Sequence, residues 1–148
     1  INGAIYGGSV ELAIAADFRI GSKNCTIQIP ASTFGIHYGY KGIKRCIDLF
    51  GLQITKKLLL LGETLKFEEL KATNFFDFYC NNPENIEKTL NDKIKKLSNL
   101  SLDSIKKMKA SINDYKNNNI NIENEKERFQ SGFESSLIID KLNKFRAK

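Results

Sequence analysis

The distribution of glycine divides this chain of 148 residues into two dissimilar parts. Nine of its ten glycines precede the sequence Asn81-Asn82-Pro83, and Gly132 is the exception. Because glycine favours tight turns and interrupts regular structure, the first part must consist of short elements joined by turns. The second part is rich in lysine, asparagine and glutamate, with apolar residues at helical spacing. We therefore expect two domains, covering residues 1–82 and 83–148.

The first part predicts short strands between helices. The turn Gly7-Gly8-Ser9 precedes a small, apolar stretch, which predicts a buried helix over residues 10–16 with Ser9 as its N-cap. Strands are expected over residues 17–21, 25–29 and 75–79. Further helices are expected over residues 43–50, 54–61 and 67–72, with Gly51 separating the first two.

The second part predicts four helices. The first begins near Pro83, the second is capped by Ser101, the third covers residues 122–133 and the last carries Leu137 to Phe145. Strand and helix layers followed by helices indicate an α/β or α+β chain, and we assign it to the α/β class.

Composition and charge exclude several classes of function. The chain carries 23 Lys+Arg and 17 Asp+Glu, giving a formal net charge of +6. Its lysines are scattered among acidic residues and asparagines, with no basic stripe or RNA-binding motif, so we expect no nucleic-acid partner. The longest apolar runs are too short to span a membrane. Three distant cysteines and a single histidine favour a reducing, cytoplasmic setting and predict no metal site.

Three features carry candidate chemistry. Gly7 and Gly8 precede a helix, whose first N–H groups could stabilise an oxyanion; a plain tight turn is the alternative. Glu11 lies in a nearly charge-free helix, where a desolvated carboxylate suits acid–base work or simply complements the helix dipole. The loop after Phe34 contains His37 and Tyr38, of which Tyr38 can donate a hydrogen bond to an anion. A lone His37 is more often structural or exposed than catalytic.

Several motifs in the first 62 residues follow one another in a familiar order. They are Asn2-Gly3, Gly7-Gly8-Ser9-Val10-Glu11-Leu12, Asp17-Phe18-Arg19, Pro30, Gly35 and Gly42. Together they resemble the crotonase family, the enoyl-CoA hydratase/isomerase superfamily. The resemblance implies the C-terminal part of a crotonase-like ββα spiral, followed by a helical trimerisation tail. It also implies an acyl-CoA thioester as substrate, a homotrimer or hexamer, and a lyase or isomerase of fatty acid metabolism with no cofactor beyond coenzyme A.

The resemblance also assigns roles to single residues. The Gly8 N–H is one of two donors that would stabilise a thioester enolate, and Glu11 would handle protons. Tyr38 would be a donor to the substrate. The remaining substrate-binding positions that we expect are Tyr6, Gly7, Gly35 and His37.

One departure from the family shapes the predicted reaction. Hydratases carry a second glutamate, and its position here is Ala31, after Pro30. The run from Tyr6 to Glu11 and the run from Phe34 to Tyr38 are most similar to the methylmalonyl-CoA decarboxylases of the family. Decarboxylation is therefore the first hypothesis. Hydration or isomerisation using Glu11 alone, and a truncated assembly module without turnover, are the alternatives.

The resemblance begins in the middle of the family's usual length. We therefore expect the chain to lack the N-terminal half of the site, including the other oxyanion donor. The chain would then be a fragment of a full enzyme, one half of a two-chain enzyme or a decayed remnant, and the sequence leaves these three possibilities open.

Overall fold

The computed structural model describes residues 1–133 and 136–146. The chain forms two compact units, Ile1–Ile94 and Lys95–Lys148, and each is described by itself. The prediction of two domains, covering residues 1–82 and 83–148, stays a prediction. Along the described chain, no helix has both the length and the apolar character that crossing a membrane requires.

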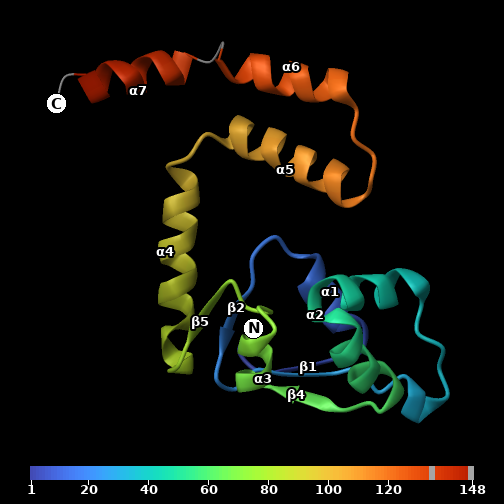
Figure 1. Cartoon of the computed structure of the whole chain (residues 1–148). Coiled ribbons are helices and arrows are strands. Elements are labelled where there is room, and N and C mark those ends of the chain that lie inside the picture. Colours follow the sequence, from blue (N-terminus) through green and yellow to red (C-terminus); the bar gives the residue numbers. More distant parts are fainter. Residues whose placement is uncertain (134–135, 147–148) are drawn as a thin grey trace. The chain divides into compact units, whose positions relative to one another are not determined.

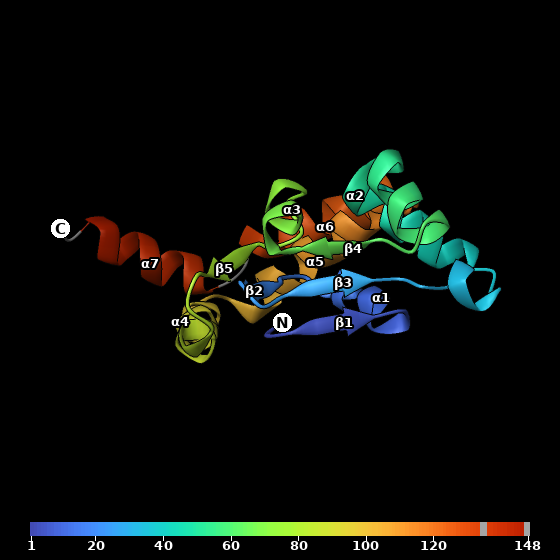
Figure 2. The same ribbon diagram turned by 90° about the horizontal axis from the view of Figure 1, so that it is seen from below.

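The first unit contains two small sheets. In the first sheet, β3 (Thr26–Gln28) lies between β1 (Ala4–Tyr6) and β4 (Thr64–Lys66), as Figure 2 shows. It pairs in parallel with β1 and antiparallel with β4. The second sheet pairs β2 (Ile20–Ser22) in parallel with β5 (Phe78–Cys80). Parallel pairing requires a crossover connection, which here supplies the helices that cover the sheets.

Figure 1 labels the helices of this unit. They are α1 (Gly8–Ala15), α2 (Tyr40–Leu60), α3 (Phe67–Ala72) and the start of α4 (Ile86–Ser98), with short 3₁₀ turns at Ser32–Phe34 and Pro83–Asn85. Within α2, Gly51 has φ 74° and ψ 168° and kinks the helix. The prediction of two helical segments separated by Gly51 is confirmed.

A single apolar core joins these helices to the first sheet. Val10 and Ile14 of α1 are buried one helical turn apart, and Ile27 is buried at the centre of β3. Phe50 of α2 stacks on Phe75 with ring centroids 5.6 Å apart. Each such side chain stabilises the fold by about 1.5–3 kcal/mol. The core therefore fixes α1 and α2 against each other and against β1.

Two expectations differ from the structure. The strand predicted over residues 25–29 is confirmed as the shorter β3, whereas those predicted over 17–21 and 75–79 are displaced toward the C-terminus as β2 and β5, because only these residues find a partner. Strand β4 was not predicted, since three residues between Gly62 and α3 are too few to show alternation.

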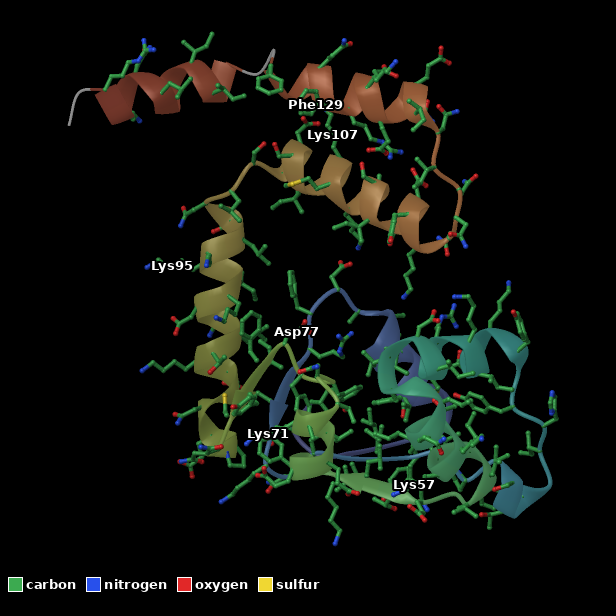
Figure 3. The ribbon with its side chains drawn as sticks, viewed as in Figure 1. Lys57, Lys71, Asp77, Lys95, Lys107 and Phe129 are labelled. Atoms are coloured by element: carbon green, nitrogen blue, oxygen red, sulfur yellow. The ribbon has the colours of Figure 1, made fainter. Side chains whose placement is uncertain are left out.

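Arg19 ties the segment before β2 to the segment before β5. Its side-chain Nε donates to the Phe75 carbonyl oxygen at 2.5 Å, and its backbone N–H donates to Asp77 Oδ2 at 2.7 Å. The guanidinium also lies 3.3 Å from the Asp77 carboxylate, which Figure 3 labels. Since the Arg19 side chain is only 11% exposed, this contact is structural.

We expect Arg19→Ala to lower the free energy of unfolding by about 2–3 kcal/mol, because it leaves a carbonyl and a carboxylate without their charged donor. Chemical denaturation measures the change. Lys23→Ala, at an exposed position of the turn after β2, is the matched control and should change stability by less than about 0.5 kcal/mol. Equal effects of the two substitutions would contradict the structural role of Arg19.

The second unit consists of the end of α4 and the helices α5 (Leu102–Lys116), α6 (Ile122–Phe133) and α7 (Ser136–Arg146). The predicted helix over residues 122–133 is confirmed. Ser101 caps α5 as predicted, accepting a hydrogen bond from the Ser104 N–H at 3.3 Å. Helix α6 is capped in the same way, since Asn121 Oδ1 accepts from the Glu123 and Asn124 N–H groups at 3.0 and 3.1 Å.

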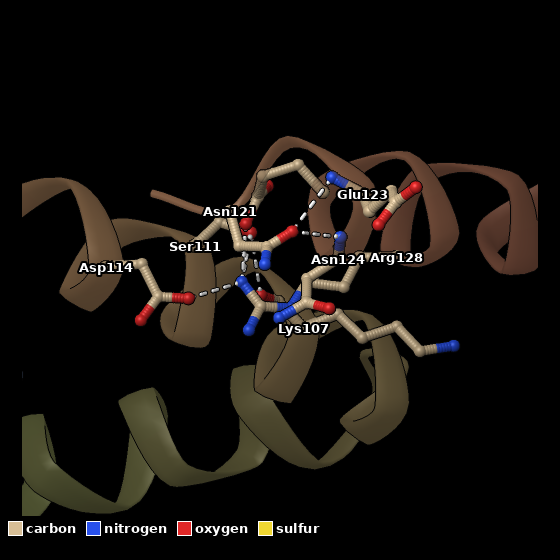
Figure 4. Close-up of polar contacts among 8 residues, drawn as sticks. Lys107, Ser111, Asp114, Asn121, Glu123, Asn124 and Arg128 are labelled. Carbon is tan, nitrogen blue, oxygen red and sulfur yellow. Dashed lines mark hydrogen bonds and ion pairs between the residues drawn. The ribbon is translucent and has the colours of Figure 1, made fainter. Parts of the chain in front are cut away.

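Arg128 of α6 holds the α5–α6 pair together (Figure 4). Its guanidinium donates to Asp114 at 2.8 Å and also contacts Ser111 and Glu125. The hydrogen bond to Asp114 raises the pKa of Arg128 further above its ordinary value, and Glu125 adds to this shift. Polar contacts therefore help to hold α5 against α6. Large apolar side chains such as Phe129 remain exposed.

Candidate active site

The turn between β1 and α1 forms one wall of the site. Gly7 adopts φ 53°, a conformation that side chains disfavour, and its N–H donates to the Gln28 carbonyl oxygen at 2.9 Å. Ser9 donates to the Tyr6 carbonyl oxygen at 2.6 Å and accepts from the Tyr6 N–H at 2.9 Å. The prediction that Ser9 caps the helix is wrong. Gly7 is the N-cap, and the Ser9 hydroxyl instead ties the helix start to the end of β1.

Gly8 presents a backbone donor at the start of α1. Among the contacts of the described residues, no acceptor bonds the Gly8 N–H. Gly8 is exposed, and nothing lies within 4 Å of the position that a Cβ would occupy. Helix starts carry free N–H groups and the positive end of the helix dipole. This position can therefore donate to an oxygen that gains negative charge.

Glu11 lies one turn further along the same helix. Its Oε2 accepts a hydrogen bond from the Arg45 guanidinium of α2 at 2.8 Å. Residues three apart share one helix face, so Glu11 follows Gly8 on the same side of α1. Helix α1 has no other charged side chain, but α2 places the Arg45 guanidinium against the Glu11 carboxylate. The residues next to Glu11 in the sequence did not indicate this contact.

Gly42 of α2 lets Glu11 and Tyr38 meet. A Cβ at Gly42 would lie 2.6 Å from Glu11 Oε1 and 2.6 Å from Tyr38 Cε1. No real Cβ tolerates such contacts, so the glycine makes room for both side chains. The predicted pair Glu11 and Tyr38 is thus brought together, although 26 residues separate them in the chain.

The Tyr38 hydroxyl is a buried donor. Among the described residues it makes no well-formed hydrogen bond, although the Glu11 carboxylate lies close enough to act on it as an acceptor. Burial raises the pKa of Tyr38 above its ordinary value, and the Glu11 carboxylate raises it further, first as a hydrogen-bond acceptor and then through its charge. The hydroxyl therefore stays protonated at neutral pH. Because a poorly satisfied buried polar group is unfavourable, the place of this hydroxyl beside Glu11 favours a role in ligand binding.

Cys46 completes the surroundings of the pair without joining its chemistry. Its thiol is buried, and burial followed by the Glu11 charge raises its pKa to about 11. Such a thiol is not a nucleophile at neutral pH. Within residues 1–133 and 136–146, no cluster of three His, Cys, Asp or Glu side chains suits a metal ion.

The other predicted positions lie around this centre. Tyr6 and Gly7 belong to the turn that precedes Gly8. Gly35 ends the 3₁₀ turn with φ 65°, and His37 is exposed on the loop before α2. Among the described residues, no hydrogen bond or ion pair joins His37 to Glu11 or Tyr38.

Sequence reasoning missed the role of Arg45. The signal was available in the spacing of α2, where Gly42, Arg45 and Cys46 are three and four residues apart and so share one helix face. That face packs against α1 at Glu11. What the sequence did not reveal is which helix this face would meet.

The enoyl-CoA hydratase/isomerase family pattern matches residues 1–143. A short-chain-enoyl-CoA hydratase of Clostridioides difficile is 39% identical over 69 residues, covering 47% of this chain and 44% of that protein. A crotonyl-CoA hydratase of Syntrophomonas wolfei is 35% identical over 69 residues, covering 47% of this chain and 26% of that protein.

Solved structures show the same fold. An enoyl-CoA hydratase from Bacillus anthracis aligns with a TM-score of 0.87 at 22% identity, covering 99% of this chain and 57% of that one. An enoyl-CoA hydratase from Thermoplasma volcanium aligns with a TM-score of 0.75 at 26% identity, covering 96% of this chain and 56% of that one.

The chain belongs to the enoyl-CoA hydratase/isomerase family, as its match over residues 1–143 shows. The crotonase-like α/β fold predicted from the sequence is confirmed. The matched segment spans less than half of the two hydratases named from sequence and a little over half of the two solved structures.

We expect Gly42→Ala to lower the free energy of unfolding by about 1–3 kcal/mol, because the new methyl group overlaps Glu11 and Tyr38. Alanine is the better helix former, so a net loss measures the overlap. Thermal and chemical denaturation test this expectation. Gly39→Ala is the control, since it has φ −62° and open space at its Cβ position. A Gly42→Ala protein as stable as Gly39→Ala would contradict the contact.

Proposed function

We propose that the chain contributes to an active site that binds acyl-CoA thioesters and stabilises a thioester enolate. One observation carries the proposal: the free Gly8 N–H begins the helix on which Glu11 follows, beside the buried Tyr38 hydroxyl. The Gly8 N–H would donate to the thioester oxygen as it gains negative charge. Donors fixed in place by the fold stabilise such charge without reorganisation in the transition state.

The first candidate reaction is addition of water to an enoyl-CoA. The names of the related hydratases support this choice. Water would add its oxygen to Cβ of the substrate while Glu11 accepts a proton from it. The electron pair would move to the thioester oxygen at Gly8, and Glu11 would return a proton to Cα.

The second candidate is decarboxylation of a methylmalonyl-CoA-like substrate. The Tyr38 donor favours it, because a substrate carboxylate is an acceptor to which the hydroxyl could donate. Arg45 offsets the negative charge of Glu11 and so weakens its repulsion of a second carboxylate. The bond to CO₂ would break, its electron pair would form the enolate, and a proton would then add to Cα.

Ala31 distinguishes the two candidates. Hydration with two glutamates would need a carboxylate at this position, which the chain replaces with a methyl group. Hydration would therefore depend on Glu11 alone. Decarboxylation needs no second carboxylate from the protein, since the substrate carries the group that leaves.

Three further proposals concern the whole protein. We propose that the chain corresponds to the C-terminal portion of longer family members, so that the second oxyanion donor lies outside it. We also propose a trimer or hexamer, supported by exposed apolar side chains such as Met108 and Phe129 on α5 and α6. An assembly module without turnover is the alternative. The native mass relative to 16.8 kDa, together with light scattering, tests these proposals.

We expect Glu11→Gln to lower kcat by roughly 100-fold or more, because glutamine cannot accept or return a proton. Hydration of crotonyl-CoA, followed by loss of enoyl absorbance, measures the change. Glu68→Gln, at an exposed glutamate of α3, is the matched control and should leave kcat unchanged. A Glu11→Gln protein with normal turnover and normal folding would rule out proton transfer by this residue.

Tyr38→Phe separates the two candidate reactions. If decarboxylation is the reaction, loss of a hydrogen bond to a charged carboxylate should raise KM for methylmalonyl-CoA by about 10-fold or more. Hydration of crotonyl-CoA, which carries no carboxylate, should change less. We expect this contrast when both thioesters are assayed side by side. If the protein converts crotonyl-CoA but not methylmalonyl-CoA, and Tyr38→Phe leaves that rate unchanged, hydration is the reaction and decarboxylation is excluded.

A further inference from the structure

Arg45 makes one directed contact with the proposed acid–base group. Its Nη1 donates to Glu11 Oε2 at 2.8 Å, joining α2 to α1 across 34 positions of sequence. The other carboxylate oxygen, Oε1, faces the space beside Gly42 and Tyr38. Arg45 therefore holds one oxygen and leaves the other on the side of the half-buried Tyr38.

This arrangement limits how the Glu11 side chain can turn. Gly42 removes the Cβ that would otherwise displace Oε1, and the Tyr38 ring lies against the same point. With Oε2 fixed by the guanidinium, rotation of the carboxylate would break the charged hydrogen bond. A catalytic base must be held close to the atom from which it takes a proton, because small displacements cost large factors in rate.

We propose that Arg45 is a positioning residue that orients the Glu11 carboxylate for proton transfer. The proposal rests on the proposed acid–base function of Glu11. Arg45 acts through Glu11 and is not itself required to touch the substrate. The planar guanidinium suits this work better than the point charge of a lysine, since it fixes the direction of the hydrogen bond.

A purely structural role predicts a different result. The side chains of Arg45 and Glu11 are 42% and 29% exposed, and ion pairs this close to solvent contribute little to folding. Lys44 and Asp48 form a comparable pair on the same helix, at 2.7 Å and with 51% and 35% exposure. Loss of either pair should change the melting temperature by a similar small amount. Only loss of the Arg45 pair should change catalysis.

The experiment compares Arg45→Gln, Arg45→Lys and Lys44→Gln in the full protein, with crotonyl-CoA and methylmalonyl-CoA as substrates. With crotonyl-CoA, which carries no free carboxylate, we expect Arg45→Gln to lower kcat about 10- to 100-fold with KM within about two-fold, because orientation and not binding is lost. Arg45→Lys should recover part of the rate, and Lys44→Gln should match the unmodified protein. An unchanged kcat in Arg45→Gln would overturn the proposal.

Chemical rescue gives a second readout. Because Arg45 is partly exposed, guanidinium ions added at millimolar concentration can reach the space left by Arg45→Ala. We expect them to restore part of kcat, whereas sodium ions at the same ionic strength should not. Failure of rescue together with a large loss of thermal stability would show a structural role and overturn the proposal.

A double substitution separates this inference from the proposed function. If Arg45 acts through Glu11, adding Arg45→Gln to Glu11→Gln should cause no further loss of kcat. Full activity of Glu11→Gln would overturn the proposed function and with it the role of Arg45. An inactive Glu11→Gln beside a fully active Arg45→Gln would overturn only the positioning role.

Discussion

The close approach of α2 to α1 at Gly42 is the constraint on which the candidate site depends. Glu11 belongs to α1, while Arg45 belongs to α2 and Tyr38 to the loop that precedes it. These side chains meet because Gly42 has no Cβ and the apolar core fixes the two helices in contact. Packing in a protein interior is dense enough that a single methyl group decides whether two polar side chains can share a space.

The electrostatics of the site follow from this packing. Glu11 exchanges part of its hydration for one guanidinium and for the neighbourhood of a tyrosine that stays protonated. A carboxylate with a fixed cation on one oxygen and a hydroxyl near the other has two inequivalent oxygens. The free Gly8 N–H, one turn earlier on the same helix, places positive potential where a thioester oxygen would gain charge. In the proposed reaction, one helix would therefore supply both the proton-handling group and the charge-stabilising donor.

Local sequence patterns predicted much of this fold, but they did not predict the contacts between its helices and strands. The helix over residues 122–133, the kink at Gly51 and the Ser101 cap depend on neighbouring residues only, and all were predicted. The Ser9 prediction failed because its hydroxyl found both partners in the backbone of the preceding strand. Glu11 and Tyr38 were singled out by motif, but the Arg45 contact depends on how α2 packs, which no local pattern encodes.

The segment around Ala31 folds without the second glutamate that hydratases of the family carry at this position. Backbone hydrogen bonds hold this segment, since the Thr33 N–H donates to the Pro30 carbonyl oxygen and the Ile36 N–H donates to that of Ala31. None of these bonds needs a side chain at position 31. The loop that carries Tyr38 therefore keeps its shape without a second glutamate. Under the proposed function, the available groups would be the Glu11 carboxylate, the Tyr38 hydroxyl and the Gly8 N–H.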